Sequence, residues 1–379
     1  MKSSSILPAL ALCILFTCPA ITFAEEATST QETVTFSKAK VLEVTNEQTA
    51  IIPGTDTPSQ SQTLKVEVLD GAEKGNILTF DNDYIQLERG DVFYLRHLTS
   101  QRDATDIYTV SDPYRLDVLI GLALIFLLLI LVFGGLPGVR GIASLAGSIV
   151  LIFWLLLPSI LQGFSPILSA IGVSSLIIVV GSYITHGFNK TTSAAVLGML
   201  ATVVITGLAA FYVVHVANLS GYTSEESVYL NFNTNGSIDM MGLLFGGIMI
   251  GLLGILYDIA IGQAVAVEEL FRAGAHMTRR QVYQRAIRIG KEHIGALVNT
   301  LAIAYVGAAL PLLLLMVSST DTGVLFILNN ELFATEIVRI LIGSIGLILA
   351  VPITTIIASY LLATLQGKGS SKETCTHIH

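Results

Sequence analysis

Residues 117–135 read DVLIGLALIFLLLILVFGG, and this stretch decides the class of the fold. A helix rises about 1.5 Å per residue, so roughly 20 consecutive apolar residues cross the hydrocarbon core of a bilayer. The stretch carries a single charge, Asp117, at its start. Its length and its composition therefore predict a transmembrane helix rather than a helix in a soluble core.

Further stretches of the same kind follow along the chain. With the first one included, we place seven membrane-spanning helices at residues 117–135, 142–161, 166–185, 193–216, 240–262, 294–317 and 338–363. The whole chain is 53% hydrophobic and 13% charged, with a mean hydropathy of +0.72. Soluble domains carry about 25% charged residues. The sequence thus predicts an α-helical polytopic membrane domain over residues 116–365.

The first 24 residues have the pattern of a secretory signal peptide. Lys2 is followed by an apolar run over residues 6–21, and Thr22-Phe23-Ala24 is a small-x-small cleavage site. An uncleaved anchor is one alternative, and a lipoprotein signal ending at Cys18 is another. All three interpretations place the next segment outside the cytoplasm.

Residues 25–115 differ from the rest of the chain in charge and periodicity. They hold 16 acidic and 8 basic residues, which is the entire formal net charge of −8. Short runs such as 33–36 and 64–68 predict β-strands, and turn signals such as Asp70-Gly71 and Arg89-Gly90-Asp91 separate such runs. We expect an extracytoplasmic β-rich domain, a small antiparallel barrel or sandwich of OB-like type.

The acidic excess excludes a nucleic-acid-binding protein, because such proteins present basic surface to phosphates. Within the acidic domain His97 stands alone and no metal-ligand spacing is present, so we interpret the carboxylates as a solvated surface. The chain has no phosphate-binding loop, nucleophile elbow, metalloprotease motif or dinucleotide fingerprint in a fitting context. We therefore expect no enzyme, cofactor or metal site, and we expect a disordered cytoplasmic tail over residues 366–379.

Basic residues predict the orientation of the spans, because they concentrate on the cytoplasmic side. The connections after the first, third and fifth spans contain Arg140, Lys190 and the basic segment 263–293. The opposite connections are acidic and reach their first basic residue at Arg339. Together with the signal peptide, this asymmetry predicts a plasma-membrane protein with its N-terminal domain outside and its C-terminus in the cytoplasm.

The cytoplasmic segment 263–293 contains a predicted amphipathic helix. Thr278 is expected to cap it, and Val282, Ala286 and Ile289 share one side. The basic residues cover the other sides: Arg279, Arg280, Arg285, Arg288 and Lys291. We expect this helix to lie on the inner leaflet of the membrane.

Asp258 is the only acidic residue well inside a predicted span, where a charge costs about 2.5 to 3.5 kcal/mol. It shares one helix face with glycines that we expect to admit a closely packed helix: Gly247, Gly251, Gly254 and Gly262. Asn299 and Thr300 enter the next span at a similar depth, and Tyr305 lies deeper. Two interpretations stay open: these four polar residues line a path for an ion or solute, or Asp258 fixes helix packing.

Several of these residues carry a resemblance to a known family. The runs Gly254–Asp258, Glu268-Glu269 and Asn299–Gly307 resemble the YibE/F-like family of bacterial membrane proteins. Ile289–Gly295 does so too, although this chain has Lys291-Glu292 where the family usually has Arg-Asp. The resemblance implies a β-rich domain followed by seven spans. It implies little about activity beyond a transport role inferred from topology.

We therefore expect a transporter or permease-like protein for a small solute or ion, with the lipid bilayer as its main partner. The alternative is a membrane scaffold or assembly factor that binds a protein through its external β-domain. An intramembrane enzyme is disfavoured because the sequence shows no nucleophile and base at matching positions.

Overall fold

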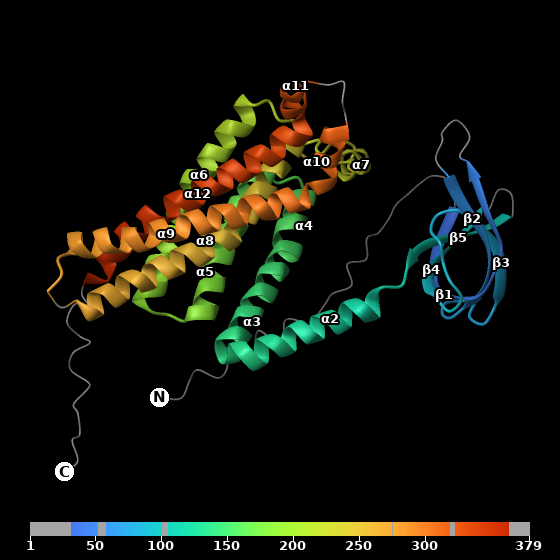
Figure 1. The fold of residues 1–379 in the computed structure, drawn as a ribbon, viewed down its shortest axis with the longest axis horizontal. Helices are drawn as coiled ribbons and strands as arrows, with labels where there is room; N and C mark the ends of the chain where they lie inside the picture. Colours follow the sequence, from blue (N-terminus) through green and yellow to red (C-terminus); the bar gives the residue numbers. More distant parts are fainter. Residues whose placement is uncertain (1–31, 52–57, 101–104, 275, 319–322, 364–379) are drawn as a thin grey trace, which may run out of the picture. The chain divides into compact units, whose positions relative to one another are not determined.

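A computed structural model describes residues 32–51, 58–100, 105–274, 276–318 and 323–363. The expected signal peptide and cytoplasmic tail lie outside these residues. The chain divides into two compact units, with the boundary between Phe133 and Gly134. The N-terminal unit contains a β-sheet and the C-terminal unit is a bundle of helices (Figure 1).

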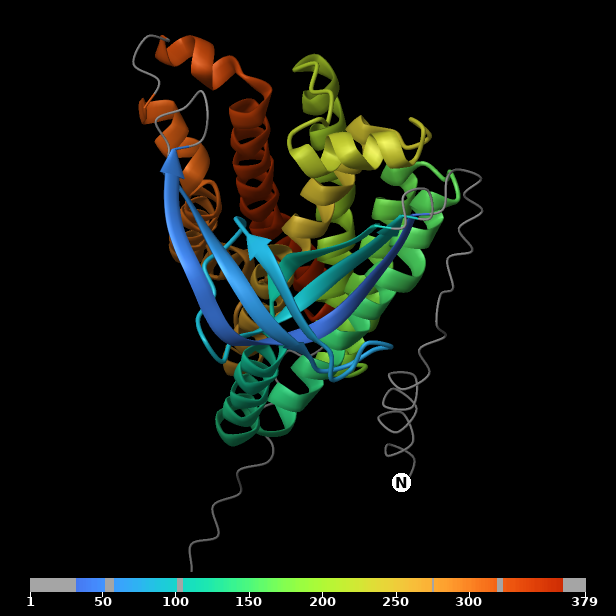
Figure 2. The same ribbon diagram turned by 90° about the vertical axis from the view of Figure 1, so that its right-hand side faces the viewer.

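The N-terminal unit is built on a five-stranded antiparallel sheet. Its strands are β1 (Glu32–Ile51), β2 (Pro58–Val68), β3 (Ile77–Asn82), β4 (Val92–Ser100) and β5 (Thr105–Pro113), in the order β3-β2-β1-β4-β5. The long β1 pairs with β4 through its first half and with β2 through its second half. The sheet is curled, so that β3 and β5 approach each other (Figure 2).

The inner face of the curled sheet buries an apolar core. Its members on the strands alternate with a period of two, as strand geometry requires, and Leu87 joins them from the segment between β3 and β4. They are Ala39, Val41, Leu64, Val66, Val68, Leu87, Phe93, Leu95 and Val110. The strand predictions over 33–36 and 64–68 are confirmed, and the predicted turns at 70–71 and 89–91 lie between strands.

A run of 46 helical residues, Leu116–Leu161, starts in the N-terminal unit and ends in the C-terminal one. It consists of α2 (Leu116–Leu129), the π-helix η1 (Ile130–Gly134), α3 (Gly135–Leu151), the π-helix η2 (Ile152–Leu156) and α4 (Leu157–Leu161). Gly135 has a φ of +53°, a left-handed conformation that interrupts regular helix. The run contains the first two predicted spans, and Gly135 lies at their junction.

The remaining predicted spans fall on the helices of the C-terminal unit. They are α5 (Pro166–His186), α6 (Lys190–Val216), α8 (Met240–Ala273), α9 (Arg279–Ala308) with α10 (Leu310–Ser318), and α12 (Glu331–Leu361). α9 and α10 meet at an angle of 66°. Pro311 explains the break, because proline lacks an N–H and its ring clashes with the preceding turn.

In the described part of the chain, five helices are long and apolar enough to cross a membrane. The number rises to six if the bent α9–α10 pair is one span. The seven predicted stretches map onto these six elements, because the first two share the run Leu116–Leu161. The number of membrane crossings stays a prediction.

Two short helices, α7 (Glu225–Asn233) and α11 (Val324–Asn329), lie at one end of the bundle, where α6 ends and α12 begins (Figure 1). Glu331 ties this end together. Its Oε1 accepts hydrogen bonds from the backbone N–H groups of Ser220, at 2.6 Å, and Gly221, at 2.9 Å. The carboxylate therefore joins the start of α12 to the segment that follows α6.

Close helix contacts in the bundle use glycine and threonine. α6 and α12 touch where Gly198 meets Thr354 and again where Thr206 meets Gly346. A methyl group on Gly198 would lie 3.0 Å from the Thr354 Cα atom, and one on Gly346 would lie 3.0 Å from Thr206. In the first pair the glycine belongs to α6 and in the second it belongs to α12. The two backbones therefore approach closely at both points, without a bulky side chain between them.

Candidate functional site

Asp258 lies on a side of α8 that is largely uncovered in the described residues, although Tyr305 of α9 reaches it at Gly251. This side, here called the open face of α8, consists of Gly247, Gly251, Gly254, Asp258 and Gly262, all of which are exposed. A methyl group on Gly247, Gly254 or Gly262 would meet no atom within 4 Å. The sequence predicted that these glycines face a closely packed helix or a cavity, and within the described chain Gly247, Gly254 and Gly262 have no helix packed on them.

The reason lies on the opposite side of the helix. α8 packs on α5, α6 and α12 through large apolar residues, among them Phe245, Met249, Leu252 and Leu256, which are buried. In a membrane such side chains are held by close van der Waals packing against their neighbours, and a glycine, which has no side chain, makes few such contacts. The rotation of α8 therefore follows its large residues and leaves the small ones uncovered.

Of the predicted path residues on α9, Tyr305 reaches the open face of α8. Its hydroxyl lies 2.9 Å from the position that a Cβ atom would take on Gly251. The guanidinium of Arg339 on α12 lies 5.9 Å from the centre of the Tyr305 ring. Arg339 Nη1 also donates to Glu336 Oε1 at 2.9 Å. A phenol and a charged pair thus stand beside the N-terminal half of this face.

Asn299 and Thr300 point elsewhere. At roughly 100° per residue they lie about 120° and 140° around α9 from Tyr305. Thr300 Oγ1 donates to the Ala296 carbonyl at 3.0 Å. No hydrogen bond joins either residue to Asp258 in the parts of the chain that the structure describes. The sequence predicted how far along the helices these residues lie. It did not determine the direction in which their side chains point around the axis of α9.

Gln263 is a polar residue of α8 that sequence reasoning missed. Its side-chain nitrogen donates to the Ala286 carbonyl of α9 and to Thr355 Oγ1 of α12, at 2.8 Å each, so three helices meet at one amide. Gly290 makes room for it, because a methyl group there would lie 2.8 Å from Gln263 Oε1. A lone amide near the end of an apolar stretch, with a glycine in the next helix, was the available signal.

The basic segment also departs from expectation. Thr278 caps α9 as predicted, in a capping box with Gln281. Val282 and Ala286 are fully buried in the helical core, among residues of α8 and α12. Two of the three residues on the apolar side that we expected on the inner leaflet therefore pack on protein, and the third, Ile289, is exposed. The basic residues are exposed: Arg279, Arg280, Arg285, Arg288 and Lys291.

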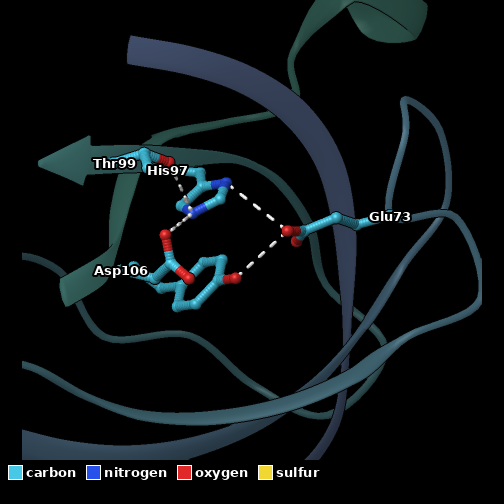
Figure 3. A network of polar contacts seen from close by, with 5 residues as sticks. Glu73, His97, Thr99 and Asp106 are labelled. Atoms are coloured by element: carbon cyan, nitrogen blue, oxygen red, sulfur yellow. Dashed lines mark hydrogen bonds and ion pairs between the residues drawn. The ribbon is translucent and has the colours of Figure 1, made fainter. Parts of the chain in front are cut away.

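His97, which stands alone in the sequence, has several partners in the folded sheet (Figure 3). Its Nε2 lies 3.0 Å from Asp106 Oδ1 on β5, and its Nδ1 lies 3.5 Å from Glu73 Oε1 in the segment between β2 and β3. Thr99 Oγ1 is 3.2 Å from the same Nε2. The histidine on β4 therefore bridges two carboxylates that are far apart in the sequence.

Tyr108 completes this network, here called the His97 network and made of Glu73, His97, Thr99, Asp106 and Tyr108. The ring of Tyr108 stacks on the imidazole at 4.4 Å, and its hydroxyl donates to Glu73 Oε1 at 3.1 Å. Burial, together with that bond, raises the pKa of Tyr108 to about 12. The hydrogen bond from His97 lowers the pKa of the Asp106 carboxyl.

The His97 network lies directly above the apolar core, because His97 follows the buried Leu95 on the same face of β4. The two ring nitrogens face different carboxylates, so the network offers no common point for an ion. Among the described residues, no group of three His, Cys, Asp or Glu side chains is arranged to hold a metal.

Comparison with known proteins supplies one finding. The sequence model of a family described as YibE/F-like protein matches residues 122–364. The match runs from α2 to the end of α12, so it includes α8, α9 and the open face and leaves the β-sheet outside. Neither the curated proteins nor the solved structures contain a match to this chain.

Proposed function

The chain belongs to the YibE/F-like family, and from that premise we propose that it is a permease-like membrane protein for a small ion or solute. The open face of α8 is the proposed path. Asp258 is its charged residue, and Tyr305 with Arg339 flanks the other end. Asn299 and Thr300 on α9 are part of the same hypothesis. They point away from the path in this structure and would line it after a rotation of α9.

One observation carries this proposal. In the described chain, Asp258 is exposed on a largely uncovered face and has no hydrogen-bond or ion-pair partner. A carboxylate placed in an apolar span without a partner costs several kcal/mol, and such residues mark ion or substrate pathways. A structural role would need a partner for the carboxylate, and none of the described residues supplies one.

The charge pattern and the strand order support the finer parts of the proposal. Cytoplasmic Arg140, Lys190 and the basic start of α9 favour seven spans in a plasma membrane, with the N-terminus outside. The strand order β3-β2-β1-β4-β5, with the end strands close together, supports an OB-like barrel for the sheet.

Flux through the purified full-length chain in liposomes tests the proposal, with protons, K⁺ and Mg²⁺ as separate probes and protein-free liposomes as the blank. We expect at least one probe to cross, and Asp258→Asn to lower its rate about tenfold or more, because the charge is removed from the path. Glu269→Gln is the matched control. Glu269 lies on the same side of α8 but beyond the predicted span, so its rate should be unchanged.

Two results would contradict the proposal. One is the absence of flux above the blank for all three probes. The other is flux in Asp258→Asn equal to that of the unmodified protein, which would remove Asp258 from the path.

The scaffold alternative also has an observation in its favour. Val34, Phe36 and Ile107 lie on one outer face of the sheet and are 40%, 60% and 50% exposed. Val34 and Ile107 both pair with Leu98, so this apolar row crosses β1, β4 and β5. Exposed apolar patches mark interaction sites. If the row binds a protein, Phe36→Ser should abolish crosslinking to that partner in cells, while Tyr84→Ser, at an exposed site elsewhere on the unit, should leave it intact.

A further inference from the structure

The short helix α7 lies across the long helices of the bundle rather than along them. Figure 1 shows α7 end-on, beside helices that are seen from the side, and Figure 2, turned by 90°, shows it lengthwise. It stands in the connection between α6 and α8, two of the helices that are long and apolar enough to cross a membrane. A helix that runs across two such spans at their ends lies parallel to the plane of the membrane that they cross.

Protein contacts hold α7 at this level. Leu219, before the helix, and Ile238, after it, are buried. Gly221, with a φ of +88°, leaves no room for a side chain against the Met240 carbonyl. Leu230, on α7 itself, packs against a core cluster made by residues of α4, α5 and α8. The helix therefore has a fixed position at the end of the bundle.

The circumference of α7 divides into three sectors. At about 100° per residue, Val228, Tyr229 and Phe232 fall within about 100° of one another, and this group is here called the apolar sector of α7. Its members are 42%, 69% and 74% exposed. Glu226 and Asn233, which are also exposed, lie together on the next part of the circumference. The remaining arc packs on protein, so α7 presents one apolar and one polar surface to its surroundings.

The local sequence makes α7 a helix although it has only nine residues. Ser224 caps it in a capping box with Ser227. Glu225 and Glu226 stand in the first turn, where the helix dipole stabilises a negative charge. Glu225 falls within the arc of the apolar sector, but at its N-terminal end, where a carboxylate reaches lipid headgroups and water.

The surroundings of the apolar sector identify lipid as its occupant. Leu161, Phe164 and Leu168, at the junction of α4 and α5 on the same end of the bundle, are exposed on the flanks of predicted spans, where acyl chains lie. Aromatic side chains bury about 150 to 250 Å² each, so the three residues of the sector fall short of the ~800 Å² per partner of a stable protein interface.

We propose that α7 is an interfacial helix whose apolar sector binds the boundary between the headgroups and the acyl chains of the phospholipid bilayer. Aromatic side chains gather at this boundary because their rings are apolar and their edges or hydroxyls stay hydrated. The polar sector faces water and the third arc faces protein. The proposal rests on the membrane insertion of the helical unit, which is part of the proposed function. α7 thereby fixes the depth at which α6 and α8 end in the bilayer.

A tryptophan placed on α7 tests this proposal, because the chain has a single tryptophan, Trp154. In a Trp154→Phe background, Phe232→Trp carries the probe on the apolar sector. Glu226→Trp, about 120° around the helix, is the matched control on the polar sector. Each full-length variant is placed in nanodiscs of phosphatidylcholine with brominated acyl chains, and in unbrominated nanodiscs with iodide in the water.

We expect bromine to quench Phe232→Trp at least about threefold more strongly than Glu226→Trp, because the apolar side of an interfacial helix enters the acyl boundary by roughly 5 to 10 Å. Iodide should quench the two variants in the reverse order. Equal quenching of both variants by bromine would overturn the proposal. Protection of Phe232→Trp from bromine and iodide alike would show that protein covers the sector, which also overturns it. If Phe232→Trp fails to fold, Tyr229→Trp carries the same test.

Trp154 in the unmodified protein is the control for membrane insertion. It is 46% exposed and lies in the run Leu116–Leu161, so bromine should quench it. When Trp154 is quenched, a negative result at Phe232 overturns the proposal for α7 and leaves the proposed function standing. An unquenched Trp154 would overturn the membrane insertion itself, and the proposal for α7 with it.

Discussion

Two sets of glycines in the helical unit look alike in the sequence and have opposite surroundings. Gly198, Gly290 and Gly346 lie where two helices touch, and a methyl group on any of them would collide with a neighbour. Gly247, Gly254 and Gly262 lie on the open face of α8, where a methyl group would meet nothing. A glycine in an apolar helix thus allows another helix to approach closely. Whether a helix does so depends on how the large side chains around the glycine pack.

The largest difference between the two sets should appear when a bulky side chain is introduced. Gly198→Leu forces α6 and α12 apart at Thr354, and we expect a loss of about 3 kcal/mol or more in the free energy of unfolding. Gly254→Leu on the open face should stay within about 0.5 kcal/mol. Denaturant unfolding in detergent, followed by circular dichroism, measures both. Equal losses in the two variants would mean that the open face is covered.

A second test concerns a buried polar side chain, Gln263, instead of a glycine. Gln263→Leu removes the donor shared by Ala286 and Thr355, so a buried acceptor loses its partner, and we expect about 2 kcal/mol of destabilisation. Gln284→Leu, at an exposed site on α9, is the control and should be nearly neutral. The same denaturant series measures both variants. Destabilisation of Gln284→Leu to the same degree would show that the loss reflects α9 itself rather than the three-helix contact.

A third test concerns the polar contact at the end of the bundle, where Glu331 joins the start of α12 to the segment after α6. Glu331→Ala removes the acceptor for the Ser220 and Gly221 amides, and we expect a loss of about 1 kcal/mol, because these groups can turn to water. Faster hydrogen exchange should follow in the segment after α6 only. Glu269→Ala removes an exposed carboxylate elsewhere and should not change the exchange rate of the segment after α6. If Glu269→Ala accelerated exchange in that segment as much as Glu331→Ala does, the effect would not come from the Glu331 contact.

The smallest effect on stability is expected for Asp258→Asn. The carboxylate has no hydrogen-bond partner among the described residues, so the change should stay within about 0.5 kcal/mol by denaturant unfolding. Together with the flux measurement, this separates a residue that serves a path from one that holds helices together. A loss above about 2 kcal/mol would assign Asp258 to packing instead, since that is what losing a buried bonded carboxylate costs.

Much of the fold was predictable from local pattern. The apolar runs, the strand segments with their turns and the capping Thr278 all depend on residues close together in the chain, and the structure confirms them. The change from strands to helices between Pro113 and Leu116 followed from charge and periodicity, whereas the two compact units divide later, after Phe133. The long run Leu116–Leu161 was less predictable, because a π-helix and a left-handed Gly135 join two apolar stretches that the sequence separates.

The candidate site was predicted only in part, for a different reason. Asp258 and Tyr305 were identified and do lie on or beside the same face of α8. Asn299 and Thr300 were grouped with them by depth, although their direction around α9 differs. His97 appeared isolated because its partners, Glu73 and Asp106, come from a turn and a strand that only the sheet brings to it.

The sequence by itself determined the elements, their apolar character and the charge difference between the two units, since these depend on composition and on periods of two and 3.6 residues. The tertiary structure alone decided which side of each helix is covered, which glycines permit contact and which acids face His97. Those features depend on the rotation of one element against another. That rotation follows from how the largest side chains of several elements pack at once, and no single segment encodes it.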